Sequence, residues 1–171
     1  AFCAGWDLKT AASLDSADPV RNFDFPADGS KPPRAPMGPS RLELSKPVIA
    51  AVEGPAVAGG MELAMWADVR IMAEDAYFGV YCRRWGVRLV GMGKAMDIIL
   101  TGRKVDAEEA YRIGLAERVV PHGKAREAAE EMAHAIARFP QACLRSDRRS
   151  AYLAWGASVR DGLVCEWETS A

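Results

Sequence analysis

A glycine pair opens the stretch that decides the fold, GGMELAMWA at residues 59–67, and one charged residue stands inside it. That residue is Glu62, and its neighbours are apolar on every side of the predicted helix. A helix without a polar face is usually buried, and burying an isolated carboxylate is costly unless it is paired, hydrogen-bonded or protonated. We therefore expect the pKa of Glu62 to be raised, toward the range in which a carboxyl group exchanges protons near neutral pH.

The glycines before Glu62 suggest a use for that proton. A helix N-terminus presents unsatisfied N–H groups and a partial positive charge, and glycines let a ligand approach the backbone closely. Gly59 and Gly60 would thus hold an oxygen anion about one helical turn from the Glu62 carboxyl group, a pairing that can form and quench an enolate. The alternative is a tight strand-to-helix turn in which Glu62 only interacts with the helix dipole, and this stretch by itself favours neither.

Length and composition predict one main domain with a substantial core, since 50% of the 171 residues are hydrophobic. The net charge of −1 and the pI of about 6.2 do not indicate a nucleic acid or an anionic membrane as partner. No apolar run reaches the length needed to cross a bilayer, and the N-terminus lacks a secretory signal pattern. We therefore expect neither a nucleic-acid partner nor a membrane partner.

Cysteine and histidine usage argues against disulfides and against zinc. The cysteines are scattered without CxxC spacing: Cys3, Cys82, Cys143 and Cys165. With only two histidines in the chain, a zinc site is not expected. Free thiols suit a reducing compartment, so we expect a cytoplasmic protein without a bound metal.

The pattern along the chain predicts an α/β protein with one long irregular segment. Residues 15–45 contain six of the ten prolines and are predicted to form a mobile loop, because prolines break both helices and central strands. The short apolar run Pro47–Val52 is typical of a buried strand that leads to the glycine turn. Two more strands are predicted at residues 68–73 and 76–79.

Helices dominate the second half of the chain. They are predicted at residues 93–100, 124–138 and 140–154, with a strand at 115–120. A further helix is expected to begin at Asp106, because Glu109 lies three residues on and completes the pattern of a capping box. The order of strands and helices supports the α/β class.

Two separated motifs resemble those of one family, the crotonase superfamily, which includes enoyl-CoA hydratases and isomerases. AFCAGWDLK at residues 1–9 resembles the family's first oxyanion-hole motif, and KPVIAAVEGPAVAGGMEL at residues 46–63 resembles the second. Shorter matches follow in the family's usual order, at residues 100–102, 107–110 and 113–116. The likeness covers roughly residues 1–139.

The resemblance implies a crotonase-like fold, a repeated ββα superhelix with a C-terminal helical region. Residues 1–120 would form the core, including the loop at 15–45, and residues 121–171 would form a helical trimerisation region. Related proteins commonly assemble as trimers or pairs of trimers, so a homotrimer or hexamer is expected.

The resemblance also implies a site for an acyl-CoA thioester, whose carbonyl oxygen accepts two backbone N–H bonds. The donors here would be the amides of Trp6 and Gly59, and Glu62 matches the first of two glutamates with which hydratases add water. The substrate-binding positions carried over are Ala4, Gly5, Asp7, Leu8, Lys9 and Gly60. CoA is part of the substrate, so no separate cofactor is expected. Lys9 either meets a CoA phosphate or is a solvated lysine at a strand end.

The chain departs from the family at the second acid. Counting from Phe78-Gly79, that acid/base position falls on Cys82, and a thiol is a poor substitute for a carboxylate that orients water. The family's glycine-rich loop is also short here, at residues 86–91. Trp6 occupies a position usually given to a small residue, so its indole either shapes the acyl pocket or packs in the ordinary way.

We predict a lyase of fatty acid metabolism, an enoyl-CoA hydratase-like enzyme that stabilises an enolate in a two-amide oxyanion hole with Glu62 as acid/base. Two alternatives stay open. A 3-enoyl-CoA isomerase can work with a single base and tolerates Cys82. A non-catalytic acyl-CoA-binding protein is compatible with both Cys82 and the short loop.

Overall fold

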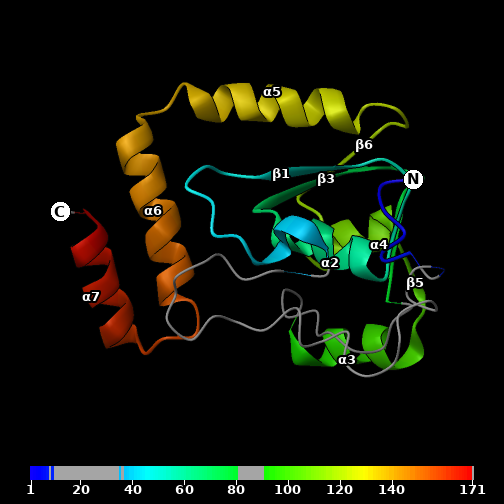
Figure 1. Cartoon of the computed structure of the whole chain (residues 1–171), viewed down its shortest axis with the longest axis horizontal. Helices are drawn as coiled ribbons and strands as arrows, with labels where there is room; N and C mark the ends of the chain where they lie inside the picture. The colour runs from blue at the N-terminus through cyan, green and yellow to red at the C-terminus, as the bar shows by residue number, and fades with distance from the viewer. Residues whose placement is uncertain (8, 10–34, 36, 81–90, 171) are drawn as a thin grey trace. The chain divides into compact units, whose positions relative to one another are not determined.

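The computed structural model describes residues 1–7, 9, 35, 37–80 and 91–170 of the chain (Figure 1). Most of the predicted loop at 15–45 lies outside these ranges, as do Leu8 and Cys82. The chain divides into two compact units. The first comprises Ala1–Glu43 and Val48–Ala129, and the second comprises Leu44–Pro47 and Glu130–Ala171.

Three parallel strands form one sheet of the first unit, in the order β1 (Ile49–Val52), β3 (Val69–Ala73) and β6 (Arg118–Val120). Parallel sheets are buried on both faces, so their strands are continuous apolar runs rather than alternating patterns. The apolar runs that predicted strands at 47–52 and 68–73 thus correspond to β1 and β3, and both predictions are confirmed with slightly narrower bounds.

The other sheet is mixed and consists of three-residue strands. Its central strand is β4 (Tyr77–Gly79), which pairs in parallel with β2 (Pro55–Val57) and antiparallel with β5 (Lys104–Asp106). The strand predicted at 76–79 is confirmed as β4. β2 and β5 were not predicted, because three residues are too few to show a period of two.

β1 and β2 belong to different sheets, as do β3 and β4, and a helix follows each of these two pairs. β1 turns into β2 through Gly54, whose φ of +78° favours glycine, and helix α2 (Gly59–Trp66) comes next. β3 likewise leads to β4 and then to helix α3 (Met92–Thr101), which ends at Gly102 with a φ of +63°. The order strand, strand, helix therefore occurs twice, as the predicted ββα repeat requires.

The prediction of a strand at residues 115–120 is wrong for residues 115–117, because β6 begins at Arg118. Helix α4 (Ala107–Arg112) ends in a tight turn, in which the amides of Leu115 and Ala116 both donate to the carbonyl oxygen of Ala110, at 2.8 and 3.1 Å. These residues complete the helix C-terminus instead of extending β6. An apolar run in the sequence does not by itself distinguish a strand from the turn that ends a helix.

Arg70 is a charged side chain buried inside the first unit, and its hydrogen bonds explain how it is tolerated. Its guanidinium donates to the carbonyl oxygens of Ala67 at 2.7 Å and Leu115 at 2.9 Å, and it forms an ion pair with Glu117. A buried charge is tolerated only when it is paired and hydrogen-bonded. Arg70 thus joins β3 to the turn that precedes β6.

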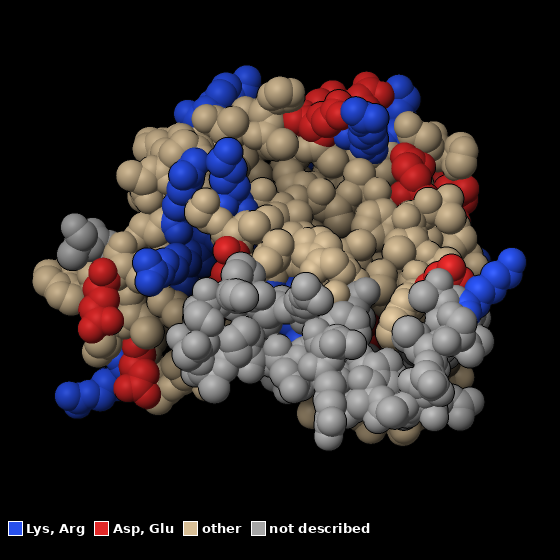
Figure 2. All heavy atoms as spheres, viewed as in Figure 1, with Lys and Arg blue, Asp and Glu red and all other residues tan. Residues whose placement is uncertain are grey.

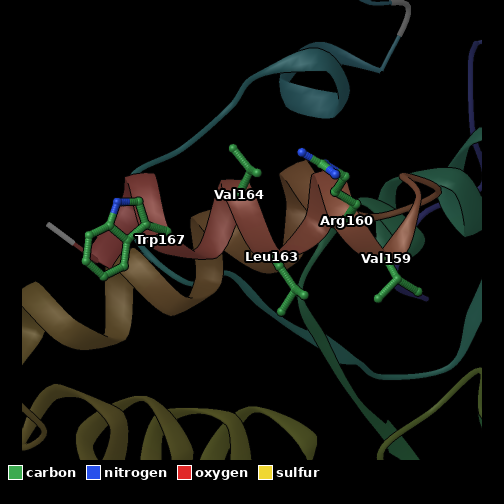
Figure 3. A pocket seen from close by; sticks show the side chains of 5 residues that line it. All are labelled: Val159, Arg160, Leu163, Val164 and Trp167. Atoms are coloured by element: carbon green, nitrogen blue, oxygen red, sulfur yellow. The ribbon is translucent and has the colours of Figure 1, made fainter.

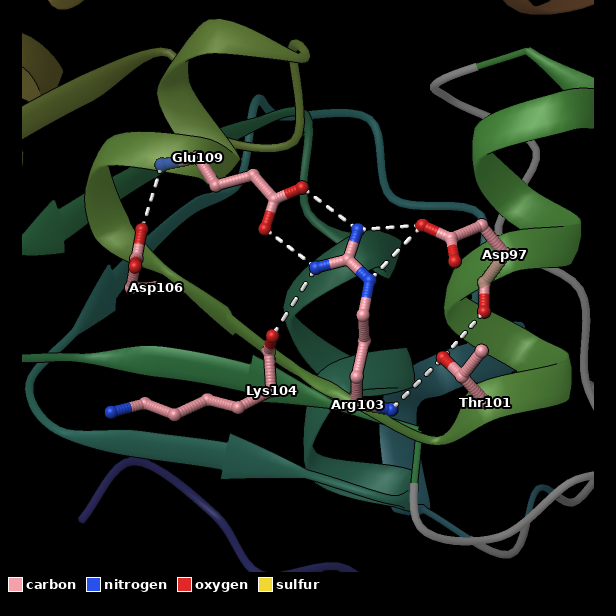
Figure 4. Close-up of polar contacts among 6 residues, drawn as sticks. All are labelled: Asp97, Thr101, Arg103, Lys104, Asp106 and Glu109. Atoms are coloured by element: carbon pink, nitrogen blue, oxygen red, sulfur yellow. Dashed lines mark hydrogen bonds and ion pairs between the residues drawn. The ribbon is translucent and has the colours of Figure 1, made fainter.

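Arg103 connects helices α3 and α4 (Figure 4). Its Nη2 lies 2.7 Å from Oδ2 of Asp97 on α3, and its Nη1 lies 2.6 Å from Oε2 of Glu109 on α4. Asp106 caps α4 as predicted, accepting the Glu109 N–H at 2.8 Å. The carboxylate of Glu109 is held by Arg103, so only one half of the predicted capping box is observed.

Stability below neutral pH should depend on Arg103. Its hydrogen bonds and charge hold the pKa of Glu109 and of Asp97 below their usual values of 4.5 and 3.8. Carboxyl groups with lowered pKa values stabilise the fold above the unfolded values, and this contribution is lost as the pH falls through the folded values. We expect Arg103→Met to lower the free energy of unfolding at neutral pH and to weaken its dependence on pH below 4.5.

Urea unfolding followed from about pH 7 to about pH 3 measures both effects. Arg118→Met removes an exposed arginine from β6 and serves as the control, because the described residues give it no ion pair. A pH dependence equal to that of the natural protein in Arg103→Met would contradict the expectation.

The second unit is helical, as predicted for the C-terminal region. Helix α5 (Ala125–Ala137) ends in it, and α6 (Gln141–Ala154) packs against α7 (Val159–Ser170). A surface hollow is lined by α7 residues only (Figure 3): Val159, Arg160, Leu163, Val164 and Trp167. None of the five described residues that line this hollow is a carboxylate, so they do not offer the acid–base chemistry predicted for Glu62. The boundary at 120/121 and the trimerisation role stay predictions.

Basic and acidic side chains both occur on the face drawn in Figure 2, in keeping with the net charge of −1. None of the helices within the described ranges combines the length and the apolar character that a bilayer span requires.

Candidate active site

The N-terminal segment lies beside the second sheet, next to β2. The Phe2 amide donates to the carbonyl oxygen of Pro55 at 2.9 Å, and the Val57 amide donates to that of Cys3 at 3.0 Å. A parallel bridge pairs Cys3 with Ala56. The two predicted oxyanion-hole motifs, which are about fifty residues apart, are therefore neighbours in the fold.

The two motifs also meet backbone against backbone, and glycines permit the contact. A Cβ built on Gly5, whose φ is +90°, would stand 2.9 Å from the nitrogen of Gly59. A Cβ built on Gly60 would stand 2.6 Å from the carbonyl carbon of Cys3. Real Cβ atoms essentially never come so close to backbone atoms, so both positions require glycine. Trp6 follows Gly5 directly, which brings its peptide unit next to that of Gly59.

The amide of Gly59 is a buried donor at the start of α2. As the first residue of the helix, Gly59 has no intrahelical acceptor for its N–H. The residue is buried, and its N–H makes no hydrogen bond with the part of the chain that the structure describes. Buried backbone donors are nearly always paired. An unpaired one at a helix N-terminus is a place where a ligand oxygen can be held.

Glu62 lies three residues beyond Gly59 on the same helix, about one turn away. Its side chain is half-buried rather than enclosed, which corrects the expectation of full burial. Desolvation by burial nevertheless raises its pKa above the ordinary value of 4.5, and this predicted direction is confirmed. The raised pKa suits a carboxyl group that must both accept and release a proton.

Residues 1–151 match the family model described as enoyl-CoA hydratase/isomerase. The chain belongs to this family. Membership confirms the assignment to the crotonase superfamily that the two motifs predicted.

Relatives in the family are similar to the chain over most of its length. Enoyl-CoA hydratase EchA19 from Mycobacterium tuberculosis is 40% identical over 171 aligned residues, which cover 87% of this chain and 60% of that protein. Carnitinyl-CoA dehydratase from Proteus mirabilis is 37% identical over 148 residues, which cover 80% of this chain and 53% of that protein. The chain therefore spans less than two thirds of the length of these relatives.

Solved structures of the family agree with the observed architecture. An enoyl-CoA hydratase from Bacillus anthracis aligns with a TM-score of 0.84 and 32% identity, covering 99% of this chain and 67% of that chain. A monofunctional enoyl-CoA isomerase from M. smegmatis aligns with a TM-score of 0.66 and 37% identity, covering 71% and 63%. The predicted crotonase-like fold is confirmed.

The remaining positions carried over from the family lie on the exposed side of the first motif. Ala4, Asp7 and Lys9 are exposed, and the Asp7 carboxylate accepts the Lys9 N–H at 2.9 Å. Leu8 and Cys82 fall outside the described residues, so their roles stay predictions. Trp6 is 40% exposed, and its role in shaping an acyl pocket also stays a prediction. Within the described ranges, no three potential metal ligands converge.

Sequence reasoning missed two contributors to the site. Met37 places its Sδ against Gly59, and Cys3 accepts the Gly5 N–H on its Sγ at 3.4 Å. Met37 lies in the proline-rich stretch and shows no periodic signal that would connect it to α2. Cys3 belongs to the first motif, but cysteine spacing in a sequence indicates disulfides and metal sites and gives no sign of a hydrogen bond to a nearby backbone amide.

Ala58, the residue before Gly59, has a strained backbone. Its φ of +51° and ψ of −128° form a combination that favours glycine, and its amide donates to the Gly79 carbonyl oxygen at 2.8 Å. Strain of this kind costs about 1–3 kcal/mol, whereas glycine costs about 0.4–1 kcal/mol through the unfolded state. We expect Ala58→Gly to raise the melting temperature by a few degrees, as measured by calorimetry.

A matched substitution separates relief of strain from the general cost of glycine. Ala133 is exposed within helix α5, where the backbone is helical. Ala133→Gly should therefore lower stability by up to about 1 kcal/mol. A change of the melting temperature in the same direction in both variants would mean that the backbone of Ala58 is not strained.

Proposed function

We propose that the protein is an acyl-CoA enzyme of the crotonase type with enoyl-CoA hydratase-like activity. The amides of Trp6 and Gly59 hold the thioester oxygen, and Glu62 transfers the proton. The observation that carries the proposal is the buried Gly59 amide, unpaired within the described residues and packed against the residue that precedes Trp6. Relatives named as enoyl-CoA hydratases support the same reaction class.

Hydration of a 2-enoyl thioester needs one stabilised anion and a group that takes up a proton and then returns it. Glu62, as a carboxylate, takes a proton from water while the hydroxyl adds to carbon 3 and the carbonyl becomes an enolate. The two amides stabilise the enolate oxygen, and one donor of this kind is worth roughly a hundredfold or more in rate. Glu62 then returns the proton to carbon 2, so that water has been added and the carboxylate is restored.

A second candidate is a 3-enoyl-CoA isomerase, which tolerates a cysteine at position 82. Isomerisation needs a single base, because Glu62 removes a proton from carbon 2 and delivers it to carbon 4. The intermediate is a dienolate, and the same two amides would stabilise its oxygen. The similarity to a monofunctional enoyl-CoA isomerase supports this alternative. A third candidate, a protein that binds acyl-CoA without converting it, also accommodates a thiol at position 82.

Product analysis with the full-length protein separates the three candidates. Crotonyl-CoA is hydrated to 3-hydroxybutanoyl-CoA by a hydratase, whereas 3-hexenoyl-CoA is converted to 2-hexenoyl-CoA by an isomerase. We expect the first conversion. The second conversion without the first would establish the isomerase, and tight acyl-CoA binding without either would establish the binding protein.

The same proposal includes the CoA-binding residues, the absence of a separate cofactor, the cellular location and the oligomeric state. The first motif (Ala4, Gly5, Asp7, Leu8 and Lys9) and Gly60 bind the CoA thioester, with Lys9 toward a phosphate. No separate cofactor takes part, since CoA arrives with the substrate. The protein is cytoplasmic and forms a homotrimer or hexamer through the region 121–171.

A further inference from the structure

A short segment of the first unit, residues 37–42, lies along helix α2. It contains the 3-10 helix η2 (Gly38–Arg41), which contacts α2. Its beginning touches the first residue of α2, because Met37 meets Gly59. Its end is bonded to the last residue, since the Trp66 Nε1–H donates to the Leu42 carbonyl oxygen at 3.1 Å. The segment is therefore attached at both ends of the helix that carries Glu62.

The thioether of Met37 fills the space beside Gly59 that a side chain would take. A Cβ built on Gly59 would lie 2.6 Å from Met37 Sδ and 3.0 Å from its Cγ. The missing side chain of Gly59 thus provides the room that Met37 occupies. Met37 is half-buried, so it is not fully enclosed by the described part of the first unit.

Trp66 holds the far end of the segment. Methionine has three rotatable bonds and adapts to many surroundings, so its own packing does not fix its position. The hydrogen bond from Trp66 to Leu42 fixes the far end of the segment at 3.1 Å. The contact made by Trp66 at the opposite end of α2 thus limits where Met37 can lie.

We infer that Met37 is a specificity-determining residue that excludes branching on the carbon next to the thioester carbonyl, and that Trp66 is its positioning residue. The inference rests on the proposed function, because the Gly59 amide places the thioester oxygen. Carbon 2 is bonded to the carbonyl carbon and therefore lies close to Gly59, where the Met37 thioether stands. A methyl group on carbon 2 competes with that thioether for the same space.

Two isomeric ligands test the inference without requiring turnover. Butanoyl-CoA and 2-methylpropanoyl-CoA contain the same atoms and differ only in branching at carbon 2. Calorimetry on the full-length protein should show that the unbranched ligand binds about tenfold more tightly or better, since one misplaced methyl group is worth about ten- to two-hundredfold. Met37→Ala should reduce this preference to about twofold or less.

Three further variants define the cause. Met37→Leu conserves the volume of the side chain and should keep the preference within about threefold of the natural value. Trp66→Phe removes the bond to Leu42 and should weaken the preference while butanoyl-CoA still binds. Met92→Ala removes a methionine of α3 that is 78% exposed and should change nothing.

The binding results test the roles of Met37 and Trp66 separately from the proposed function. An unchanged preference in Met37→Ala, with both ligands bound, would overturn the role of Met37 and leave the proposed function intact. An unchanged preference in Trp66→Phe, accompanied only by a lower melting temperature, would leave Trp66 with a purely structural role. If the natural protein binds neither ligand, the proposed function and this inference both fail.

The contact itself can be checked without any ligand. The methyl group of Gly59→Ala must push Met37 aside, so Met37→Ala should recover part of the stability lost by Gly59→Ala. Melting temperatures of both single variants and the double variant form the cycle. Additive effects would contradict the contact between Met37 and Gly59.

Discussion

Glu62→Gln should lower the turnover of an enoyl-CoA by at least about a hundredfold, because a positioned acid–base group typically contributes about 10²- to 10⁴-fold. The amide nearly matches the carboxyl group in shape but cannot take up a proton. The expectation holds for hydration and for isomerisation alike, because both reactions pass a proton through Glu62. Affinity for a saturated acyl-CoA should be retained, since the proposed oxyanion donors are backbone amides.

The same substitution should not destabilise the fold, and the sign follows from the raised pKa. Burial disfavours the charged form of Glu62, which raises its pKa above 4.5. A carboxyl group of this kind lowers stability above its unfolded pKa, because folding then requires a carboxylate to be desolvated. At neutral pH the Gln variant should therefore melt at the same temperature as the natural protein or higher.

The pH profile gives an independent check on Glu62. If the carboxylate is the base, kcat/KM of the natural protein should rise with pH through a midpoint above 4.5. Glu108 provides the matched control, because it is an exposed glutamate in the first turn of α4. Glu108→Gln should leave turnover unchanged, whereas undiminished turnover in Glu62→Gln would remove Glu62 from the mechanism.

Local sequence signals predicted much of the frame around this site. The glycine pair marked the start of α2, Gly102 marked the end of α3, and Asp106 marked the cap of α4, each within a residue of the observed boundary. Such signals succeed because a cap or a positive φ is decided by a few adjacent residues. The two motifs also indicated that the segments around residues 5 and 59 belong together, and the structure brings Gly5 against the Gly59 nitrogen. That the amides of Trp6 and Gly59 share one oxygen stays a prediction.

Contacts that depend on tertiary structure could not be predicted in this way. Arg103 takes the Glu109 carboxylate that the capping-box pattern assigned to Asp106, and Arg70 is enclosed through carbonyl groups that only the folded chain brings together. Met37 is a third case, because its contact with Gly59 depends on how residues 37–42 lie along α2. The pattern of neighbouring residues in the sequence does not identify the partners of these side chains.

The glycines at the junction of the two motifs are not equivalent, and their neighbours explain the difference. A side chain at Gly59 would meet the end of a flexible methionine, which can move. A side chain at Gly60 would meet the carbonyl carbon of Cys3 at 2.6 Å, and that peptide is held by the bond from the Val57 amide at 3.0 Å. Substitution at Gly60 must therefore displace backbone.

Gly60→Ala should consequently destabilise the first unit and abolish activity together. Overpacking in a rigid surrounding costs about 1–3 kcal/mol or more, and the clash here begins at Cβ, where no rotamer change can relieve it. We expect a loss near the upper end of that range, which corresponds to a melting temperature lower by about 10 °C. Calorimetry measures the stability, and an enoyl-CoA assay measures whether residues 1–7 still reach Gly59.

Gly93→Ala is the control, because Gly93 lies within helix α3 and a Cβ there would meet nothing within 4 Å. Alanine is favoured over glycine in a helix by about 0.8–1 kcal/mol, so this variant should be as stable as the natural protein or more stable. The two substitutions should change stability in opposite directions, although both add the same methyl group to a helical glycine. A Gly60→Ala protein that melts normally would mean that the Cys3 carbonyl does not lie against α2, and the two amides would then have no common oxygen to hold.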